Sequence, residues 1–403
     1  MYGIEIALIL FIVLICILNL DKNFNLSLVF FYSFIIRLIL IILDIYIFEI
    51  PFSRLDSTGF EWKAAVWGEF GLEYSISNFF IEGYSFFYSN FLSLFYAIFG
   101  RSIFLSKLLS TIVSLLVLYF SYKLIILIWI EKKFAIFTII ILSFFPLFLV
   151  VSTFTLREVY IMLILIMGVY FYVLYEKNSN IFFFILSILI SCLHILLHGP
   201  MVLILINLII VYYLSNFISI LKKNYKTLYS FILFNIFLLI IVSFVIINNM
   251  SIEIPYLGKL TNFVNILEIL QKHFNDTAYG RTAYPDLLYP KNLFYILILT
   301  PVRFIYFLCG PFIGTTLLDY YIVLEGCIYG YLLFILLINF KIIIKNKYII
   351  YLLLLIFPLI LYYSWGVNNY GTAIRHKIKF LPIILVIVSP LIYSNFNRLI
   401  KIK

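Results

Sequence analysis

Residues 105–130 read LSKLLSTIVSLLVLYFSYKLIILIWI, an almost unbroken apolar run whose charged side chains are Lys107 and Lys123. A helix of about 20 such residues crosses the hydrocarbon core of a bilayer. Runs of this length recur from one end of the 403-residue chain to the other, and the chain is 65% apolar and only 11% charged. This composition is typical of a polytopic membrane protein and of no soluble class.

The apolar runs are rich in Ile, Phe and Tyr, which favour strands in water. In lipid, every backbone N–H and C=O must be paired within its own segment, so helices are expected instead. The predicted fold class is therefore all-α, a polytopic transmembrane helical protein.

The basic residues lie in short clusters between the apolar runs, where they indicate the cytoplasmic side of the membrane. With these clusters inside, the chain is expected to cross the membrane about 11 times, with its N-terminus outside and its C-terminus inside. The expected spans are 2–20, 26–50, 105–130, 134–152, 159–175, 181–197, 201–221, 228–248, 320–340, 348–366 and 379–396.

Two further apolar stretches do not fit as simple crossings. Residues 84–100 are predicted to lie as a helix in the outer interface, and residues 295–314, interrupted by Pro301 and by Gly310-Pro311, are predicted to be re-entrant or broken. Residues 1–403 are expected to form a single transmembrane domain, with outer-face loops at 51–104 and 249–293. The second loop is expected to carry a short amphipathic helix and to act as a lid.

The net charge of +10 does not indicate nucleic acid, because the Lys and Arg residues are scattered between spans and form no continuous basic face. The four cysteines lie in or beside apolar runs without CxxC spacing, so neither a metal site nor a disulfide is predicted.

Asp56 lies in RLDSTGFEWKAAVWGEF, residues 54–70, a stretch with far more charge than its surroundings. Asp56, Phe60 and Ala64 follow at helical spacing, which predicts a helix that begins near Asp56. Asp56 is then either the cap of this helix or a partly desolvated carboxylate that takes a proton from a sugar hydroxyl. The other charges of the stretch are expected to seat the helix at the interface.

Two more polar groups are predicted on the same outer side. TLREVY (155–160) places Arg157 and Glu158 at the start of a span, where the helix dipole favours the acid and the arginine invites an anion. NNYGTAIRHK (368–377) is unexpectedly basic for an outer loop, and its amides, hydroxyl and guanidinium suit a sugar phosphate. HILLH (194–198) has metal-compatible spacing but favours interface hydrogen bonds.

Four segments resemble the GT-C superfamily of polytopic glycosyltransferases, which take sugars from polyprenyl-phosphate carriers on the outer face of the membrane. They are DSTGFEWKA, similar to the family's acid-x3-aromatic-x3-Ala pattern, GYSFFYSNFLSLFYAIFGRS, KLLSTIVSLLVLYFSYKL and FFPLFLVVSTFTLREV. The resemblance covers about residues 50–175 and implies a GT-C-like fold. It implies that Asp56 is the catalytic acid of the first loop and that Glu158 is the second acidic residue.

NYGTAIRHKIKFLP and LTPVRFIYFLCGPF look like segments of bacterial O-antigen and capsule repeat-unit polymerases, and TLRE is similar to a segment of exopolysaccharide polymerases. The chain shows neither the adjacent acidic pair of many monosaccharide transferases nor the soluble C-terminal domain of oligosaccharyltransferases. These departures favour the polymerase.

The function expected from this resemblance is a bacterial inner-membrane glycosyltransferase with its site on the periplasmic face, most simply a repeat-unit polymerase that transfers a glycan from undecaprenyl pyrophosphate to an acceptor hydroxyl. Partners are the polyprenyl-linked sugar, membrane lipids and a chain-length regulator, with no nucleic acid. No cofactor or metal is assigned, and a divalent cation is left open. The expected catalytic residues are Asp56, Glu158 and His376, and the expected phosphate-binding residues are Arg157, Arg281, Arg303, Arg375, Asn369 and Thr372.

Three alternatives remain at this point. A transferase of one sugar from polyprenyl phosphate needs the same groups. A flippase of lipid-linked oligosaccharide needs a cationic cavity open to both sides and an internal repeat, whereas here the charges gather on one side. A non-catalytic assembly subunit predicts that single loop substitutions are silent.

Overall fold

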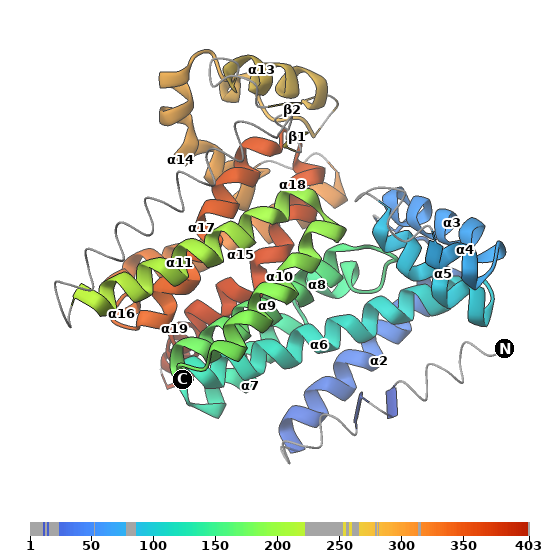
Figure 1. Ribbon diagram of the computed structural model, residues 1–403, viewed down its shortest axis with the longest axis horizontal. Coiled ribbons are helices and arrows are strands. Elements are labelled where there is room, and N and C mark those ends of the chain that lie inside the picture. The colour runs from blue at the N-terminus through green and yellow to red at the C-terminus, as the bar shows by residue number, and fades with distance from the viewer. Residues whose placement is uncertain are drawn as a thin grey trace. The chain divides into compact units, whose positions relative to one another are not determined.

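The computed structural model describes residues 11–12, 14–15, 24–51, 53–77, 86–221, 253–254, 258–259, 266–278, 280, 282–312 and 316–401. The regular secondary structure of these residues is helical apart from one short antiparallel ladder between β1 (Glu253–Ile254) and β2 (Gly258–Lys259) (Figure 1). The helices are α2 (Phe24–Tyr46), α3 (Leu55–Glu69), α4 (Leu72–Ser77), α5 (Phe87–Phe99), α6 (Ile103–Trp129), α7 (Lys132–Ser143), α8 (Pro146–Val151), α9 (Glu158–Asn178), α10 (Ile181–Leu197), η2 (Gly199–Met201), α11 (Val202–Leu221), α13 (Ile266–Thr277), η4 (Asp286–Leu288), α14 (Leu293–Cys309), α15 (Leu317–Ile338), α16 (Phe340–Ile343), α17 (Lys347–Gly366), α18 (Tyr370–Lys377), η5 (Ile378–Phe380) and α19 (Leu381–Lys401).

Seven stretches of the described chain are long and apolar enough to cross a membrane. They are Asn25–Tyr46, Ile103–Trp129, Glu158–Asn178, Gly199–Asn216, Asp319–Ile338, Lys347–Gly366 and Tyr370–Phe396. Helix α10, with 17 residues, is a shorter apolar helix. Most of the predicted span 2–20 and all of 228–248 lie outside the described residues.

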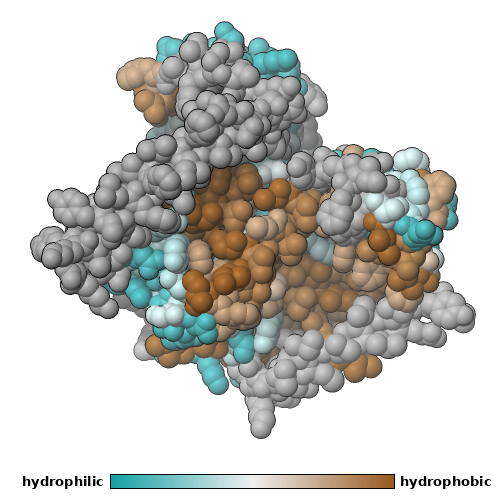
Figure 2. All heavy atoms as spheres, in the orientation of Figure 1, coloured by the Kyte–Doolittle hydropathy of each residue, from teal (hydrophilic) through white to brown (hydrophobic). Residues whose placement is uncertain are grey.

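Helix α10 shows why this protein suits lipid rather than water. It turns Ser187, Ser191 and His194 inward, where all three are fully buried, and it exposes Phe182 and Leu189. A helix in water has the opposite arrangement, with its apolar stripe facing the core. Figure 2 shows hydrophobic side chains over the face formed by α6, α9 and α10. The exposed apolar face is the one a bilayer would cover.

The predicted span 134–152 is not one helix. Helix α7 ends at Ser143 and α8 begins at Pro146, because the residue before a proline is driven out of helical conformation and Phe145 is extended. The first amides of α8 have no cap within their own segment. Glu325 of α15 supplies one, since its Oε1 accepts a hydrogen bond from the Leu147 backbone N–H at 2.6 Å.

The predicted break at Pro301 is wrong. Helix α14 runs through Pro301 and ends at Cys309, immediately before Gly310-Pro311. The C-terminal end of α14 packs tightly against α15 at Gly326, where an added Cβ atom would lie 1.9 Å from the Cys309 carbonyl oxygen. Glycine is therefore needed at this crossing, as it is in many small-residue contacts between membrane helices.

The described chain forms two compact units. Unit 1 contains residues 1–198, 308–352 and 374–403, and unit 2 contains residues 199–307 and 353–373. Within unit 1, α9 lies between α6 and α10, and α3 packs against α5 (Figure 1). Asp56, Glu158 and Arg375, which form the contact described next, belong to unit 1.

Candidate functional site

Asp56 lies in the first turn of α3, as its sequence spacing predicted. The helix has Arg54 at its N-cap position and no side-chain capping bond, so the structure does not use Asp56 as a cap. The Asp56 side chain is 57% exposed.

Helix α3 is held by an ion pair between the buried Glu61 and the half-exposed Arg101, which the sequence did not reveal. Arg101 donates to both carboxylate oxygens of Glu61, with its Nε 3.0 Å from Oε1 and its Nη2 2.9 Å from Oε2, and the Tyr96 hydroxyl donates to Oε1 at 3.2 Å. Hydrogen bonding to Glu61 raises the pKa of Arg101. Glu61 is buried, so its expected role as a surface charge is wrong, and it fixes α3 to the segment that includes α5.

Helix α9 brings Arg157 and Glu158 to the same place. Glu158 is the first residue of α9 and its side chain is only 2% exposed, which places a carboxylate at the positive end of the helix dipole. Arg157 Nη1 donates to the Leu197 carbonyl oxygen at 3.1 Å. Leu197 ends α10, so Arg157 lies at the negative end of a second helix, where a cation is favoured.

Helix α18 carries Arg375 into the site. The sequence 367–377 was expected to be a loop, but it is helical from Tyr370 onward. Asn369 explains this start, because its Oδ1 accepts a hydrogen bond from the Gly371 backbone N–H at 2.8 Å. The near-continuous helical path through η5 then directs Arg375, His376 and Lys379 into unit 1.

Arg375 joins the two acids. Its Nη2 lies 2.7 Å from Glu158 Oε1, and its Nη1 forms an ion pair with Asp56 Oδ2. Three residues that are far apart in the sequence thus form one contact, and each had been selected from its own local pattern. The Arg375 side chain is 25% exposed, so it lies between the exposed Asp56 and the buried Glu158.

A buried basic group lies next to this contact. Lys379 Nζ donates to His376 Nδ1 at 2.8 Å, and the His376 ring stacks on the His198 ring with centroids 5.4 Å apart. Burial lowers the pKa of His198. His376 Nδ1 already accepts a bond, which leaves this nitrogen engaged in the structure. Lys379 was not predicted, although it follows Arg375 by four residues and thus shares its helix face.

His194 makes the interface hydrogen bond that was favoured for it, because its Nε2 donates to the Ile161 carbonyl oxygen at 3.2 Å. This bond joins α10 to α9 just behind Glu158. No group of three or more His, Cys, Asp or Glu residues in the described part of the chain is arranged to hold a metal ion.

Arg303 belongs to unit 2 and has other partners than a phosphate. It donates to the carbonyl oxygens of Leu288, Ser364 and Val367 at 2.8–3.0 Å and also to Asn368 Oδ1. These bonds use four of the five guanidinium N–H groups. Its guanidinium also lies 4.3 Å from the centre of the Trp365 ring. The structure therefore uses Arg303 to clamp backbone segments together.

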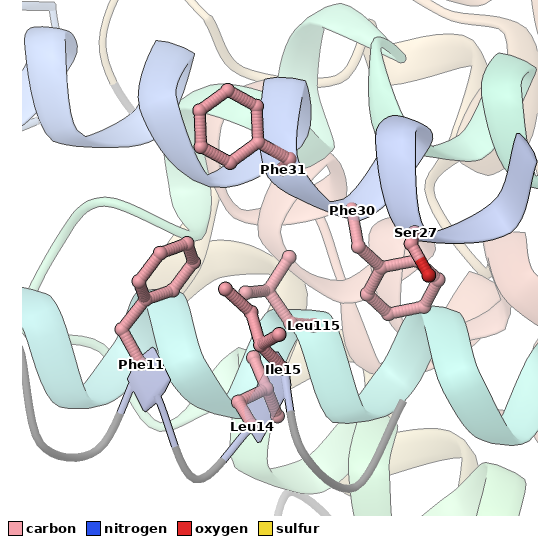
Figure 3. Close-up of a pocket in the computed structure, with 7 residues that line it drawn as sticks. All are labelled: Phe11, Leu14, Ile15, Ser27, Phe30, Phe31 and Leu115. Atoms are coloured by element: carbon pink, nitrogen blue, oxygen red, sulfur yellow. The ribbon is translucent and has the colours of Figure 1, made fainter. Parts of the chain in front are cut away.

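The remaining predicted site residues are also separate from the Arg375 contact. Asn369 Oδ1 accepts from the Thr282 hydroxyl at 3.0 Å in addition to capping α18, and Thr372 is exposed. Both belong to unit 2, and Arg281 lies outside the described residues. The cavity in Figure 3 is lined by Phe11, Leu14, Ile15, Ser27, Phe30, Phe31 and Leu115, so it contains none of the candidate site residues.

Unit 1 keeps its charged site and its basic loops at opposite helix ends. Asp44 at the end of α2 pairs with Lys107 at the start of α6, on the side where Glu158 begins α9. At the other end of α6, Ile128 accepts a bond from Asn346, which follows Lys345. These contacts place Asp44 and Lys107 at one end of α6 and Asn346 at its other end.

Helix length, hydropathy and the inverted pattern of α10 together define a polytopic helical membrane protein. No protein-family model, curated protein or solved structure matches the chain.

Proposed function

We propose that this protein is a membrane glycosyltransferase that takes a glycan from a polyprenyl-(pyro)phosphate carrier and transfers it to a hydroxyl of an acceptor glycan. The observation that carries the proposal is the contact of Arg375 with both Asp56 and Glu158. It combines a permanently charged phosphate-binding group with two carboxylates that can accept a proton.

The charges around this contact fit an anionic donor. Arg157 and Arg375 bring two guanidinium groups next to the two carboxylates, and both arginines are half-buried. Buried charge is costly unless it is compensated, so half-buried guanidinium groups in a membrane protein favour anionic partners. A phosphate leaving group meets this need, and guanidinium groups stabilise the negative charge that develops on it.

The finer proposal is an O-antigen or capsule repeat-unit polymerase of the bacterial inner membrane, acting on its periplasmic face. It is supported by the resemblance of residues 299–312 and 369–382 to segments of such polymerases. The GT-C-like fold is proposed from the separate resemblance of residues 50–175 to that superfamily.

The test is reconstitution of the purified chain in nanodiscs with an undecaprenyl-pyrophosphate-linked repeat unit, followed by mass spectrometry of the glycans. A ladder of repeats supports the polymerase, and a single addition from a polyprenyl-phosphate sugar supports the simpler transferase. Loss of either product in Arg375→Lys, with unchanged folding, supports the bidentate role of this residue. Absence of any transfer from either donor type refutes the proposal.

The proposed sidedness has its own test. In a cysteine-free background, Thr58→Cys, which is exposed and two residues from Asp56, should react with a membrane-impermeant thiol reagent added to the periplasmic side. Lys345→Cys, also exposed, should react only after the membrane is opened. The reverse pattern would place the site in the cytoplasm and exclude a periplasmic transferase.

A further inference from the structure

Two buried polar atoms in the Arg375 contact have no hydrogen-bond partner in the described structure. One is Glu158 Oε2, an acceptor, and the other is Arg375 Nε, a donor. They belong to the side chains that the 2.7 Å ion pair already joins, and each is bonded to the same carbon as the atom that makes the pair. A buried donor or acceptor without a partner is unfavourable, so both atoms call for a ligand.

The chemistry of the missing group follows from these two atoms. A group that satisfies both must donate to a carboxylate and accept from a guanidinium. A hydroxyl does both, because it carries one donor and two acceptor lone pairs. A phosphate diester oxygen accepts only, so it satisfies Arg375 and leaves Glu158 without a partner.

The ion pairs of Asp56 and Glu158 with Arg375 differ in how easily a competing anion can break them. The Glu158 side chain is 2% exposed and is fixed at the start of α9, whereas the Asp56 side chain is 57% exposed. An exposed ion pair contributes little stability, so a phosphate that competes for Arg375 Nη1 displaces Asp56 far more readily than Glu158. Phosphate and carboxylate both accept hydrogen bonds from guanidinium with similar geometry. The donor phosphate therefore replaces the Asp56 carboxylate on Arg375 as one anion for another.

We propose that Glu158 and Arg375 bind the acceptor sugar hydroxyl, with Glu158 Oε2 as its base, and that Asp56 occupies the position of the donor phosphate on Arg375 until the donor binds. This inference rests on the proposed glycosyl transfer. It reverses the order expected from the sequence, in which Asp56 was the leading base.

The step balances as follows. The acceptor oxygen forms a bond to the anomeric carbon of the donor sugar and gives its proton to Glu158 Oε2. The bond from that carbon to the phosphate oxygen breaks, and its electron pair remains on the polyprenyl (pyro)phosphate, next to Arg375. Glu158 then releases the proton to water.

The experiment compares Glu158→Gln with Asp56→Asn in full-length protein in nanodiscs, measuring transfer and, separately, binding of undecaprenyl phosphate. Glu158→Gln should reduce the transfer rate about 10²- to 10⁴-fold, the usual contribution of a general base, while binding of undecaprenyl phosphate persists. Asp56→Asn should lose far less of the transfer rate than Glu158→Gln, and it should bind undecaprenyl phosphate up to about fivefold more tightly, because a competing exposed pair is gone.

Glu158→Asp is the control for misfolding of Glu158→Gln. It keeps the charge opposite Arg375 and should retain part of the transfer that Glu158→Gln loses. Transfer lost in Asp56→Asn but kept in Glu158→Gln would overturn this inference and leave glycosyl transfer standing. Weaker binding of undecaprenyl phosphate to Asp56→Asn would overturn the exchange at Arg375. If the unmodified chain neither transfers a glycan nor binds undecaprenyl phosphate, the proposed function itself fails.

Discussion

Replacing Arg375 with alanine tests the central contact through stability, without any knowledge of the substrate. The substitution leaves Glu158 as a buried charge without its main partner, and breaking a buried pair in this way costs about 3–5 kcal/mol. Arg157 and Lys379 also act on the same carboxylate, so we expect the lower limit, about 3 kcal/mol, in the free energy of unfolding.

The second substitution decides which acid matters. Adding Glu158→Gln to Arg375→Ala removes the stranded charge and should recover about 2 kcal/mol. Adding Asp56→Asn instead should recover less than about 1 kcal/mol, because the Asp56 side chain is 57% exposed and exposed pairs contribute little.

The assay is unfolding in mixed micelles with increasing SDS, followed by circular dichroism, on the unmodified chain and the single and double variants. A normal stability for Arg375→Ala would show that the three residues do not form this contact. Recovery with Asp56→Asn and none with Glu158→Gln would show that the assignment of buried and exposed partners is reversed.

Three further predictions concern other features. Gly326→Ala should lower the melting temperature, because its Cβ atom would lie 1.9 Å from a backbone oxygen, whereas Gly330→Ala meets its nearest atom at 3.7 Å and should be neutral; equal effects would contradict the close crossing. Glu61→Gln should cost about 1 kcal/mol of stability and exposed Glu69→Gln less than about 0.5 kcal/mol, measured by SDS unfolding. An unchanged stability in Glu61→Gln would show that the Glu61–Arg101 ion pair does not hold α3. Burial lowers the pKa of His198, so the unfolded chain gains a proton below about pH 6.5 that the folded chain does not, and stability should fall as the pH drops below that value. His198→Gln should show a shallower fall in melting temperature between pH 7.5 and 5.5, and an identical fall would contradict this.

The sequence singled out three residues that the structure brings into contact, but it did not predict that they would meet. Asp56, Glu158 and Arg375 were each found from a local rule: an acid near a helix start, or a cation on the side of the membrane that usually has few. Helices that cross a membrane return to the same two surfaces, so residues assigned to one surface have a fair chance of meeting. Which of them meet depends on helix packing, and no local pattern contains that information.

The misses have the same cause. Lys379 follows an outer cluster of basic residues and reads as a membrane-edge lysine, but it is buried against His376. Arg303 reads as a costly charge in need of an anion, yet backbone carbonyl groups from distant segments satisfy it. Sequence shows that a buried charge needs a partner, and only the fold shows whether that partner is a substrate or the chain itself.

The hydrogen bond from Leu147 to Glu325 can form only late in the synthesis of the chain. Helix α8 has six residues, too few to cross a bilayer, and the backbone N–H of Leu147 at its start is bonded to a side chain 178 positions later. When the ribosome has completed α8, this partner has not yet been made. Until then, the Leu147 backbone N–H must be hydrogen-bonded by water, lipid headgroups or the insertion machinery. Only the arrival of α15 completes it, so this helix start reaches its final form after most of the chain has been inserted.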